Sequence, residues 1–339
     1  MQSFYSHGKL LLTAEYAVLK GARALAIPCK KGQTLTFEIQ DIKHLIWESF
    51  DLNQNVWFTA TFQCSSFSIV ESSEATTAEK LSAILKAARA QNEEFLVHQG
   101  GSVKTLLEFD KNWGLGSSST LISNIASWAN VNPYKLLEQS FGGSGYDLAC
   151  ALSDSPICYT RNGLNPSVEF VLFDPPFKEG LFFVYLNKKQ SSLEAINALD
   201  WKLIDSHLID TINSITEKIL TCNDQSIFNT LLLEHEKSIG SLSKQTPVKD
   251  LLFSDFKGAI KSLGAWGGDF ILASGNKETP KYFLNKGYRV VIPYSEMIFK
   301  NSLLIFKMSD PDIELIPEEM YIAVDPIPID VERPIVIFF

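Results

Sequence analysis

The sequence has little of what metal centres and disulfide frameworks require. Its 339 residues contain five cysteines without a C-x-x-C pair and five histidines without an H-E-x-x-H arrangement. An odd number of scattered cysteines is typical of reduced thiols in a cytosol. The sequence therefore predicts a cytoplasmic protein that is held by a hydrophobic core, with neither disulfides nor a zinc site.

Long apolar runs and positive charge are also scarce. No uninterrupted apolar segment approaches the roughly 18–20 residues of a membrane-spanning helix, and MQSFYSHGK (1–9) lacks the basic and apolar regions of a secretory signal. A net charge of −9 argues against a nucleic-acid surface, which needs a basic stripe. Neither a membrane nor a nucleic acid is an expected partner, whereas a small anionic ligand needs only a few local lysines.

The order of predicted elements favours an α+β protein of two domains. Segments rich in β-branched and aromatic residues fill 33–70 and predict meandering strands, and the apolar period of 76–92 predicts a helix. Consecutive prolines in FDPPF (173–177) interrupt any regular element. Strands and helices do not alternate strictly, so we expect domains at 1–176 and 177–339 rather than a doubly wound sheet.

The second domain is predicted to mix strands with long helices. A buried strand is expected at 180–187, a helical region at 191–242 with a break near 222–224, and a further helix at 250–263. The tail beyond alternates strand-like segments with prolines.

The stretch NWGLGSSST (112–120) is the clearest candidate for a binding site. It lies between an apolar run at 102–109 and a segment of helical period at 120–130. Free N–H groups at a helix N-terminus attract anions, and glycine lets a ligand approach the backbone. The stretch predicts a phosphate loop of an uncommon kind, because no G-x-x-x-x-G-K-[ST] occurs and Ser119 stands where a dinucleotide fingerprint has its third small residue.

Two further glycine loops, GGSGYD (142–147) and GAWGGD (264–269), are open to two interpretations. Each could be no more than a turn. Asp147, directly after the first of them, could accept a proton from a substrate hydroxyl or cap the helix that follows.

In combination, these segments resemble the GHMP kinases of the mevalonate-pathway type. GLGSSS (114–119) resembles their phosphate loop, and SHGKLLLTAEYAVLKGARALAIP (6–28), GSGYDLACAL (143–152) and KSLGAWGGDFILAS (261–274) resemble three further motifs in the family's order. The resemblance implies a GHMP kinase fold, with a mixed α/β N-terminal domain that binds ATP and a ferredoxin-like α+β C-terminal domain.

The same resemblance implies an ATP- and Mg²⁺-dependent phosphotransferase. Asp147 would be the catalytic base, or the group that orients the acceptor oxygen, and Lys9 would pair with it. Ser118 and Glu138 would hold Mg²⁺, although Glu138 is only nine residues before Asp147 and closer than usual. The residues expected at ATP are Gly114, Leu115, Gly116, Ser117, Ser118 and Ser119.

The acceptor that the resemblance favours is 5-phosphomevalonate, with mevalonate second. Asp269 in GAWGGD and the loop LNKKQSSLEAI (186–196) resemble phosphomevalonate kinases, and Ser191 with Glu194 forms a possible capping box after two lysines. A capped helix with solvated lysines is the alternative reading, and Arg161 is a further candidate anion contact. The substrate-binding residues implied are Glu15, Tyr16, Gly145, Lys188, Ser191, Ser192, Gly267, Gly268 and Asp269.

Some positions depart from the family pattern. Ser6-His7 replaces Ala-Pro, Ala14 replaces glycine, and Trp266 enters the third glycine loop, where it would narrow the site, stack on a ligand or cover an apolar gap between domains. Two other functions therefore stay open, namely a non-catalytic metabolite sensor of the GHMP fold and, more remotely, an NAD-dependent oxidoreductase. A monomer or a homodimer is expected.

Overall fold

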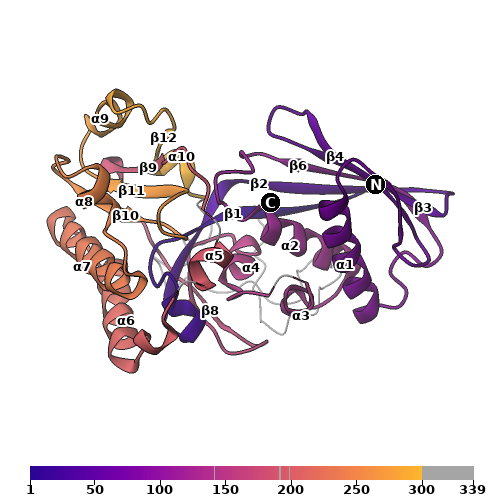
Figure 1. Cartoon of the computed structure of the whole chain (residues 1–339), viewed down its shortest axis with the longest axis horizontal. Coiled ribbons are helices and arrows are strands. Elements are labelled where there is room, and N and C mark those ends of the chain that lie inside the picture. The colour runs from indigo at the N-terminus through magenta and orange to yellow at the C-terminus, as the bar shows by residue number, and fades with distance from the viewer. Residues whose placement is uncertain (141, 191, 198, 300–339) are drawn as a thin grey trace, which may run out of the picture.

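Two β-sheets with their helices lie next to each other in the molecule (Figure 1). The computed structural model describes residues 1–140, 142–190, 192–197 and 199–299, without the side chains of Ser192 and Leu193. Ser191 and the part of the tail beyond residue 299 lie outside the described residues. None of the helices in the described part is long and apolar enough to cross a membrane.

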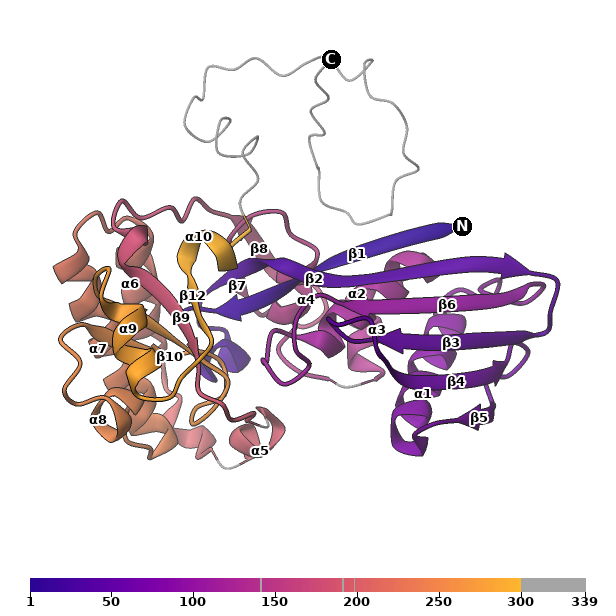
Figure 2. The same cartoon turned by 90° about the horizontal axis from the view of Figure 1, so that it is seen from above.

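The first sheet has eight strands in the order β5-β4-β3-β6-β2-β7-β8, with β1 paired to β2. Its helices α1 to α4 gather on one side (Figure 1), and the view from above shows the strands side by side (Figure 2). The strands expected within 33–70 and the helix expected at 76–92 are confirmed. The elements are β1 (Gln2–Leu11), β2 (Ala24–Gln40), β3 (His44–Phe50), β4 (Val56–Gln63), β5 (Ile69–Ser72), α1 (Ala75–Gln91), β6 (Gly100–Leu107), α2 (Ser117–Ala129), α3 (Pro133–Glu138), α4 (Tyr146–Ala151), β7 (Ile157–Thr160) and β8 (Ser167–Phe170), with a 3₁₀ turn at Ala17–Lys20.

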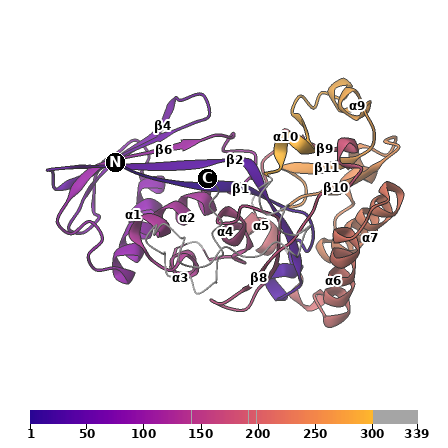
Figure 3. The same cartoon turned by 180° about the vertical axis from the view of Figure 1, so that it is seen from behind.

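The second sheet has four antiparallel strands in the order β10-β11-β9-β12. With helices between β9 and β10 and between β11 and β12, this order is the ferredoxin-like arrangement expected from the sequence. Helices α6 and α7 lie next to each other in the view from behind (Figure 3). The elements are β9 (Leu181–Tyr185), α5 (Ser192–Asn197), α6 (Ser206–Leu220), α7 (Gln225–Ser243), α8 (Val248–Leu252), β10 (Ala259–Ser262), β11 (Phe270–Ser274), α9 (Thr279–Asn285), β12 (Val291–Pro293) and α10 (Tyr294–Met297), with 3₁₀ turns at Lys178–Gly180 and Trp201–Leu203.

The helix predicted at 250–263 is wrong. Only Val248–Leu252 is helical, and Ala259–Ser262 forms strand β10 instead. All four residues of β10 are buried, in contact with a neighbouring strand and with α7. A four-residue segment that is buried on both faces has no period that distinguishes a strand from a helix, so tertiary contacts decided its structure.

A single apolar cluster joins the two sheets. Leu25 and Ile27 of β2 share it with Phe183 of β9 and Leu272 of β11, all of them almost fully buried. A large hydrophobic contact of this kind holds two parts of a chain in one arrangement more firmly than a polar one does. The apolar contact therefore fixes the position of the loops of one sheet relative to those of the other.

Helix α2 is fastened to the first sheet by buried hydrogen bonds. The Asn124 Nδ2 donates to the Gln33 carbonyl at 2.9 Å, and the Ser6 hydroxyl donates to the Asn124 Oδ1 at 2.8 Å. The Thr120 hydroxyl reaches the Gln33 Oε1 at 2.7 Å. Buried polar groups have to be paired in this way, and the pairing determines where the N-terminal turn of α2 lies.

We expect Asn124→Ala to lower the free energy of unfolding by about 2–4 kcal/mol, because it removes a buried amide that donates to the Gln33 carbonyl and accepts from the Ser6 hydroxyl. Chemical denaturation measures the change. Ser127→Ala, in the same helix but only half-buried, is the matched control and should change stability by less than about 0.5 kcal/mol. Equal effects of the two substitutions would contradict this account of how α2 is held.

Candidate active site

The predicted phosphate loop ends at the first turn of α2. The helix begins at Ser117, and Gly116 before it has φ 87° and provides no side-chain cap. The N–H groups of a first helical turn have no partner within the helix, so here they are free to bind an anion. The Ser118 side chain is exposed and those of Ser117 and Ser119 are half-buried. The start of α2 thus offers backbone N–H groups and an exposed serine hydroxyl as hydrogen-bond donors.

Lys9 lies directly beneath this loop. Its backbone N–H donates to the Leu115 carbonyl at 3.0 Å. A Cβ on Gly116 would lie 3.1 Å from Lys9 Cε, so glycine is needed there both for its positive φ and for the close approach of the lysine. The loop and strand β1 are therefore one structural unit.

The Lys9 ammonium pairs with the catalytic aspartate predicted from the sequence. Lys9 Nζ lies 2.9 Å from Asp147 Oδ1 and donates to the Tyr146 hydroxyl oxygen at 3.1 Å. Helix α4 begins after Gly145, and its start has no side-chain cap. Asp147 thus does not cap the helix. Its carboxylate instead contacts Lys9, which comes from strand β1, far earlier in the chain.

The surroundings of this pair keep the Lys9 side chain protonated and positively charged. Burial works to lower the pKa of Lys9, but the neighbouring Asp147 carboxylate and Tyr146 hydroxyl outweigh it, and the pKa is raised above its ordinary value. The Tyr146 hydroxyl is buried, which raises its pKa and keeps it a neutral phenol. The side chains of Lys9 and Asp147 are 12% and 28% exposed, so the pair is shielded yet reachable.

The third glycine loop meets the phosphate loop at Asp269. A Cβ on Gly114 would overlap the Asp269 carboxylate, so the two loops touch at a position where only glycine fits. Asp269 Oδ1 accepts the Gln190 N–H at 3.2 Å, and the Asp269 N–H donates to the Lys188 carbonyl at 2.7 Å. Burial raises the pKa of Asp269 above its ordinary range, although Lys9 opposes this. The Asp269 carboxylate therefore lies between the loop that follows β9 and the phosphate loop.

One pocket lies at these loops, and a second hollow lies along the chain ahead of the phosphate loop. A small pocket between the sheets brings together Lys9, Gly114 and Asp269, along with Trp113 and Phe270. A larger hollow of about 340 Å³ follows the chain that leads into the phosphate loop, and sequence reasoning missed it because no motif marks its residues. It is lined by Lys31, Leu52, Gln54, Leu106, Leu107 and Glu108.

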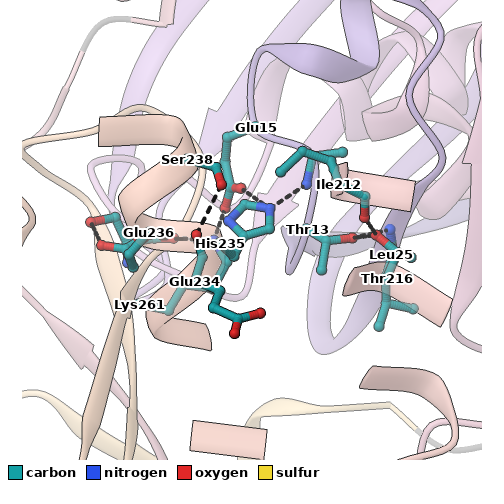
Figure 4. Close-up of polar contacts among 12 residues, drawn as sticks. Thr13, Glu15, Leu25, Ile212, Thr216, Glu234, His235, Glu236, Ser238 and Lys261 are labelled. Carbon is teal, nitrogen blue, oxygen red and sulfur yellow. Dashed lines mark hydrogen bonds and ion pairs between the residues drawn. The ribbon is translucent and has the colours of Figure 1, made fainter. Parts of the chain in front are cut away.

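Glu15 belongs to a buried cluster of ionisable side chains between the sheets (Figure 4), and the neighbouring Tyr16 is buried as well. The Glu15 carboxylate accepts a hydrogen bond from Lys261, and both side chains are at most 1% exposed. The backbone N–H of Trp266 donates to the Tyr16 hydroxyl oxygen at 3.0 Å. The structure thus brings Glu15 to Lys261, and it records no contact between Glu15 and the Lys9–Asp147 pair among the described residues.

Trp266 covers the apolar gap between the two sheets. Its side chain is 2% exposed and packs with Ala14, Tyr146 and Ile239 in one cluster. Of the three roles considered from the sequence, this is the one that its surroundings match, because a ring so enclosed has no face for a ligand.

Comparisons with known proteins identify the fold. No protein-family model matches the sequence, and no curated protein sequence matches it. The mevalonate kinase of Methanococcus jannaschii matches in structure with a TM-score of 0.65 at 14% identity, over 88% of this chain and 98% of that one. The Streptococcus pneumoniae phosphomevalonate kinase in complex with phosphomevalonate and AMPPNP matches with 0.63 at 16% identity, over 84% and 96%.

The Lactococcus lactis galactokinase complexed with galactose gives a TM-score of 0.64 at 14% identity, over 88% of this chain and 94% of that one. The chain has the GHMP kinase fold. Because solved structures with a phosphorylated acid and with a free sugar match equally well, this likeness does not distinguish between acceptors.

For several other residues considered at the site from the sequence, the described part of the chain records no contact with the Lys9–Asp147 pair. Glu138 ends α3 with an exposed side chain, and the Lys188 side chain is exposed. Lys189 Nζ donates to the Lys111 carbonyl at 3.0 Å, and Arg161 donates to the Leu19 carbonyl at 3.3 Å. Gly267 and Gly268 lie in the third loop, where a Cβ on Gly268 would meet the Lys188 carbonyl at 2.8 Å.

A magnesium ion at this site would take part of its coordination from phosphate oxygens. No group of three or more His, Cys, Asp or Glu side chains in the described part of the chain could hold a metal ion. Mg²⁺ usually keeps several waters and binds substrate phosphates with one or two protein groups. The exposed Ser118 hydroxyl at the anion site is a suitable protein ligand for an ion that arrives on phosphate oxygens.

The buried cluster around Glu15 predicts a pH-dependent stability. Burial raises the pKa of Glu236 to about 8 from its ordinary value of 4.5, although Lys261 opposes the shift. A raised folded-state pKa means that stability is present below the unfolded value and is lost as the pH rises through about 8. We expect the wild type to lose on the order of 2–3 kcal/mol, relative to Glu236→Gln, between about pH 6 and about pH 9.

Denaturation curves of both proteins at a series of pH values measure this loss. Glu234→Gln, an exposed position in the same helix, is the control and should keep the wild-type dependence. Parallel stability curves for wild type and Glu236→Gln would show that the Glu236 carboxyl does not titrate in this range.

Proposed function

We propose that this chain is an ATP-dependent small-molecule kinase of the GHMP type. The observation that carries the proposal is the Lys9–Asp147 ion pair at 2.9 Å, directly beneath the free N-terminal turn of α2. Phosphoryl transfer needs positioned charges beside a phosphate cradle and little covalent chemistry from the protein. A cradle, a cation and a carboxylate are the three groups assembled here.

In this proposal the triphosphate of ATP binds the residues from Gly114 to Ser119. The backbone N–H groups and serine hydroxyls would donate hydrogen bonds to its phosphate oxygens, as helix N-termini do to anions. The hollow lined by Lys31 and Leu52 would take the nucleoside, since it lies beside the chain that runs from Leu106 into the loop. Magnesium held by the phosphates and Ser118 would neutralise charge on the β- and γ-phosphates.

Lys9 and Asp147 would then act on the acceptor. With an alcohol acceptor, the hydroxyl oxygen attacks the γ-phosphorus, the bond to the β–γ bridging oxygen breaks, and ADP leaves with that electron pair. Asp147 takes the hydroxyl proton. With a phosphate acceptor, an ionised oxygen attacks and no proton moves, so Asp147 and Lys9 serve to orient it and to balance its charge.

The acceptor that we favour is 5-phosphomevalonate. Asp269 occupies the position where the sequence resembles phosphomevalonate kinases, and it contacts the Lys188–Gln190 segment beside the phosphate loop. A solved phosphomevalonate kinase with phosphomevalonate and AMPPNP has the same fold. Mevalonate is the second candidate, because mevalonate kinases match equally well.

Coupled ADP release with ATP, Mg²⁺ and each acceptor in turn tests the proposal. Turnover with 5-phosphomevalonate alone supports the favoured acceptor, and turnover with mevalonate alone supports the second. Silence with both, together with tight binding of either, would indicate a metabolite sensor rather than a kinase.

We expect Asp147→Asn to reduce kcat by roughly 10²–10⁴-fold, because the substitution removes the carboxylate that accepts a proton or orients the acceptor. Binding of Mg²⁺·AMPPNP should stay close to wild type, since Asp147 lies outside the phosphate loop. Asp154→Asn is the matched control, as its side chain is 60% exposed just beyond α4, and should turn over normally. Wild-type turnover by Asp147→Asn would remove the kinase assignment.

A further inference from the structure

A chain of buried charges spans the two sheets near the candidate site without being part of it (Figure 4). Lys261 at the end of β10 contacts Glu15, which follows β1, and lies 3.9 Å from Glu236 of α7. Ser262 donates its N–H to Glu236 at 3.0 Å and its hydroxyl to the same carboxyl at 3.1 Å. All of these side chains are at most 2% exposed. A cluster so enclosed is costly unless each charge has a partner.

The backbone around Glu15 is bent in order to bring its side chain inward. Ala14 and Tyr16, on either side of Glu15, have φ values of 68° and 62°. Residues with a Cβ rarely adopt positive φ, because the conformation is sterically strained. The Ala14 N–H donates to His235 Nε2 at 2.9 Å, which holds the bend against α7. Contacts with Lys261 and His235 therefore maintain a backbone that would otherwise relax.

The histidine takes part as a neutral acceptor. Because Nε2 accepts the Ala14 N–H, the ring proton has to be on Nδ1. Burial lowers the pKa of His235 well below its ordinary value, and Lys261 adds to this effect. The positive charge of the cluster thus rests on Lys261, which faces Glu15.

Lys261 stands directly before the third glycine loop. Ser262 and Ile271 pair across β10 and β11, and the loop between them carries Trp266 and Asp269. The segment after β1 makes two contacts here. Glu15 accepts a hydrogen bond from Lys261 in the strand before the loop, and the Tyr16 hydroxyl accepts one from the backbone N–H of Trp266 within the loop. The far end of the same loop places Asp269 against Gly114 of the phosphate loop.

We propose that the Glu15–Lys261 ion pair is a positioning clamp that holds the third glycine loop, and with it Asp269, in register with the phosphate loop. The expected effect of the clamp on turnover rests on the proposed function. Its expected effect on the position of the loop does not depend on that function. Lys261 and Glu15 are positioning residues, because neither contacts the Lys9–Asp147 pair in the described part of the chain.

The alternative is that the ion pair contributes only to folding. A buried ion pair that is replaced as a whole by neutral side chains often leaves stability unchanged or improved, whereas removing one partner is strongly destabilising. The double variant Glu15→Gln/Lys261→Met therefore separates stability from positioning. It lacks the unpaired charge of either single variant, and it also lacks the clamp.

Hydrogen exchange of the 263–269 amides is the first readout, and it needs no ligand. We expect Lys261→Met alone to lower the denaturation midpoint, and the double variant to regain most of it. In the double variant the 263–269 amides should nevertheless exchange faster than in the wild type. Lys286→Met, which removes a partly exposed ion pair to Asp255, is the matched control and should leave these amides unchanged.

Steady-state kinetics with the acceptor that is turned over is the second readout. In the double variant we expect kcat/KM for the acceptor to fall roughly 10- to 100-fold, as misplacement of a site by about an ångström does, with KM for ATP nearly unchanged. A general loss of folded protein would lower the active fraction and spare both KM values.

Wild-type exchange at 263–269 together with wild-type acceptor kcat/KM in a stable double variant would overturn the clamp. If the double variant does not fold, Tyr16→Phe is the milder substitution. It removes only the acceptor for the Trp266 N–H and should also speed exchange near Trp266, and wild-type exchange there would count against the clamp. A wild type without ADP release would refute the proposed function alone, since the exchange result does not depend on it.

Discussion

The ion pair between Lys9 and Asp147 is the contact on which the rest of the candidate site depends. Lys9 comes from β1 and Asp147 from the first turn of α4, and the loop ahead of α2 rests on Lys9 through the Leu115 carbonyl. Three segments that are far apart in the sequence thus meet at one lysine. A neutral side chain at position 9 would leave a partly buried carboxylate unpaired, and a Cβ at position 116 would displace the lysine.

A second layer of contacts fixes where this centre lies relative to the other sheet. The apolar cluster shared by both sheets sets their overall arrangement, and the buried Glu15–Lys261 pair acts at the end of β10, directly before the loop that carries Asp269. Apolar packing is not directional, whereas a buried ion pair tolerates only a narrow geometry. The combination explains how a loop from the second sheet is brought against Gly114 of the first.

Local signals in the sequence predicted the parts of the structure that local physics determines. The amphipathic period of 76–92 became α1, and the glycine–serine stretch became a loop that ends at the N-terminus of α2. The contact between Lys9 and Asp147 was expected from the order of motifs that resemble the GHMP kinases, and the structure places the two side chains together. Neither composition nor spacing would have paired them.

Features that depend on distant contacts were not predictable. Strand β10 was taken for a helix because its burial on both faces leaves no period to read. The partnership of Lys261 with Glu15 carries no local signal, since a lysine before a loop is usually solvated. The nearest such signal was Ala14, where the family pattern has glycine and the backbone has a φ of 68°.

The most direct test of the central claim is a hydrogen-exchange footprint of the whole chain with and without Mg²⁺·AMPPNP. The account predicts that protection is strongest at the 114–119 amides, and absence of protection there, or stronger protection with NADH, would contradict it.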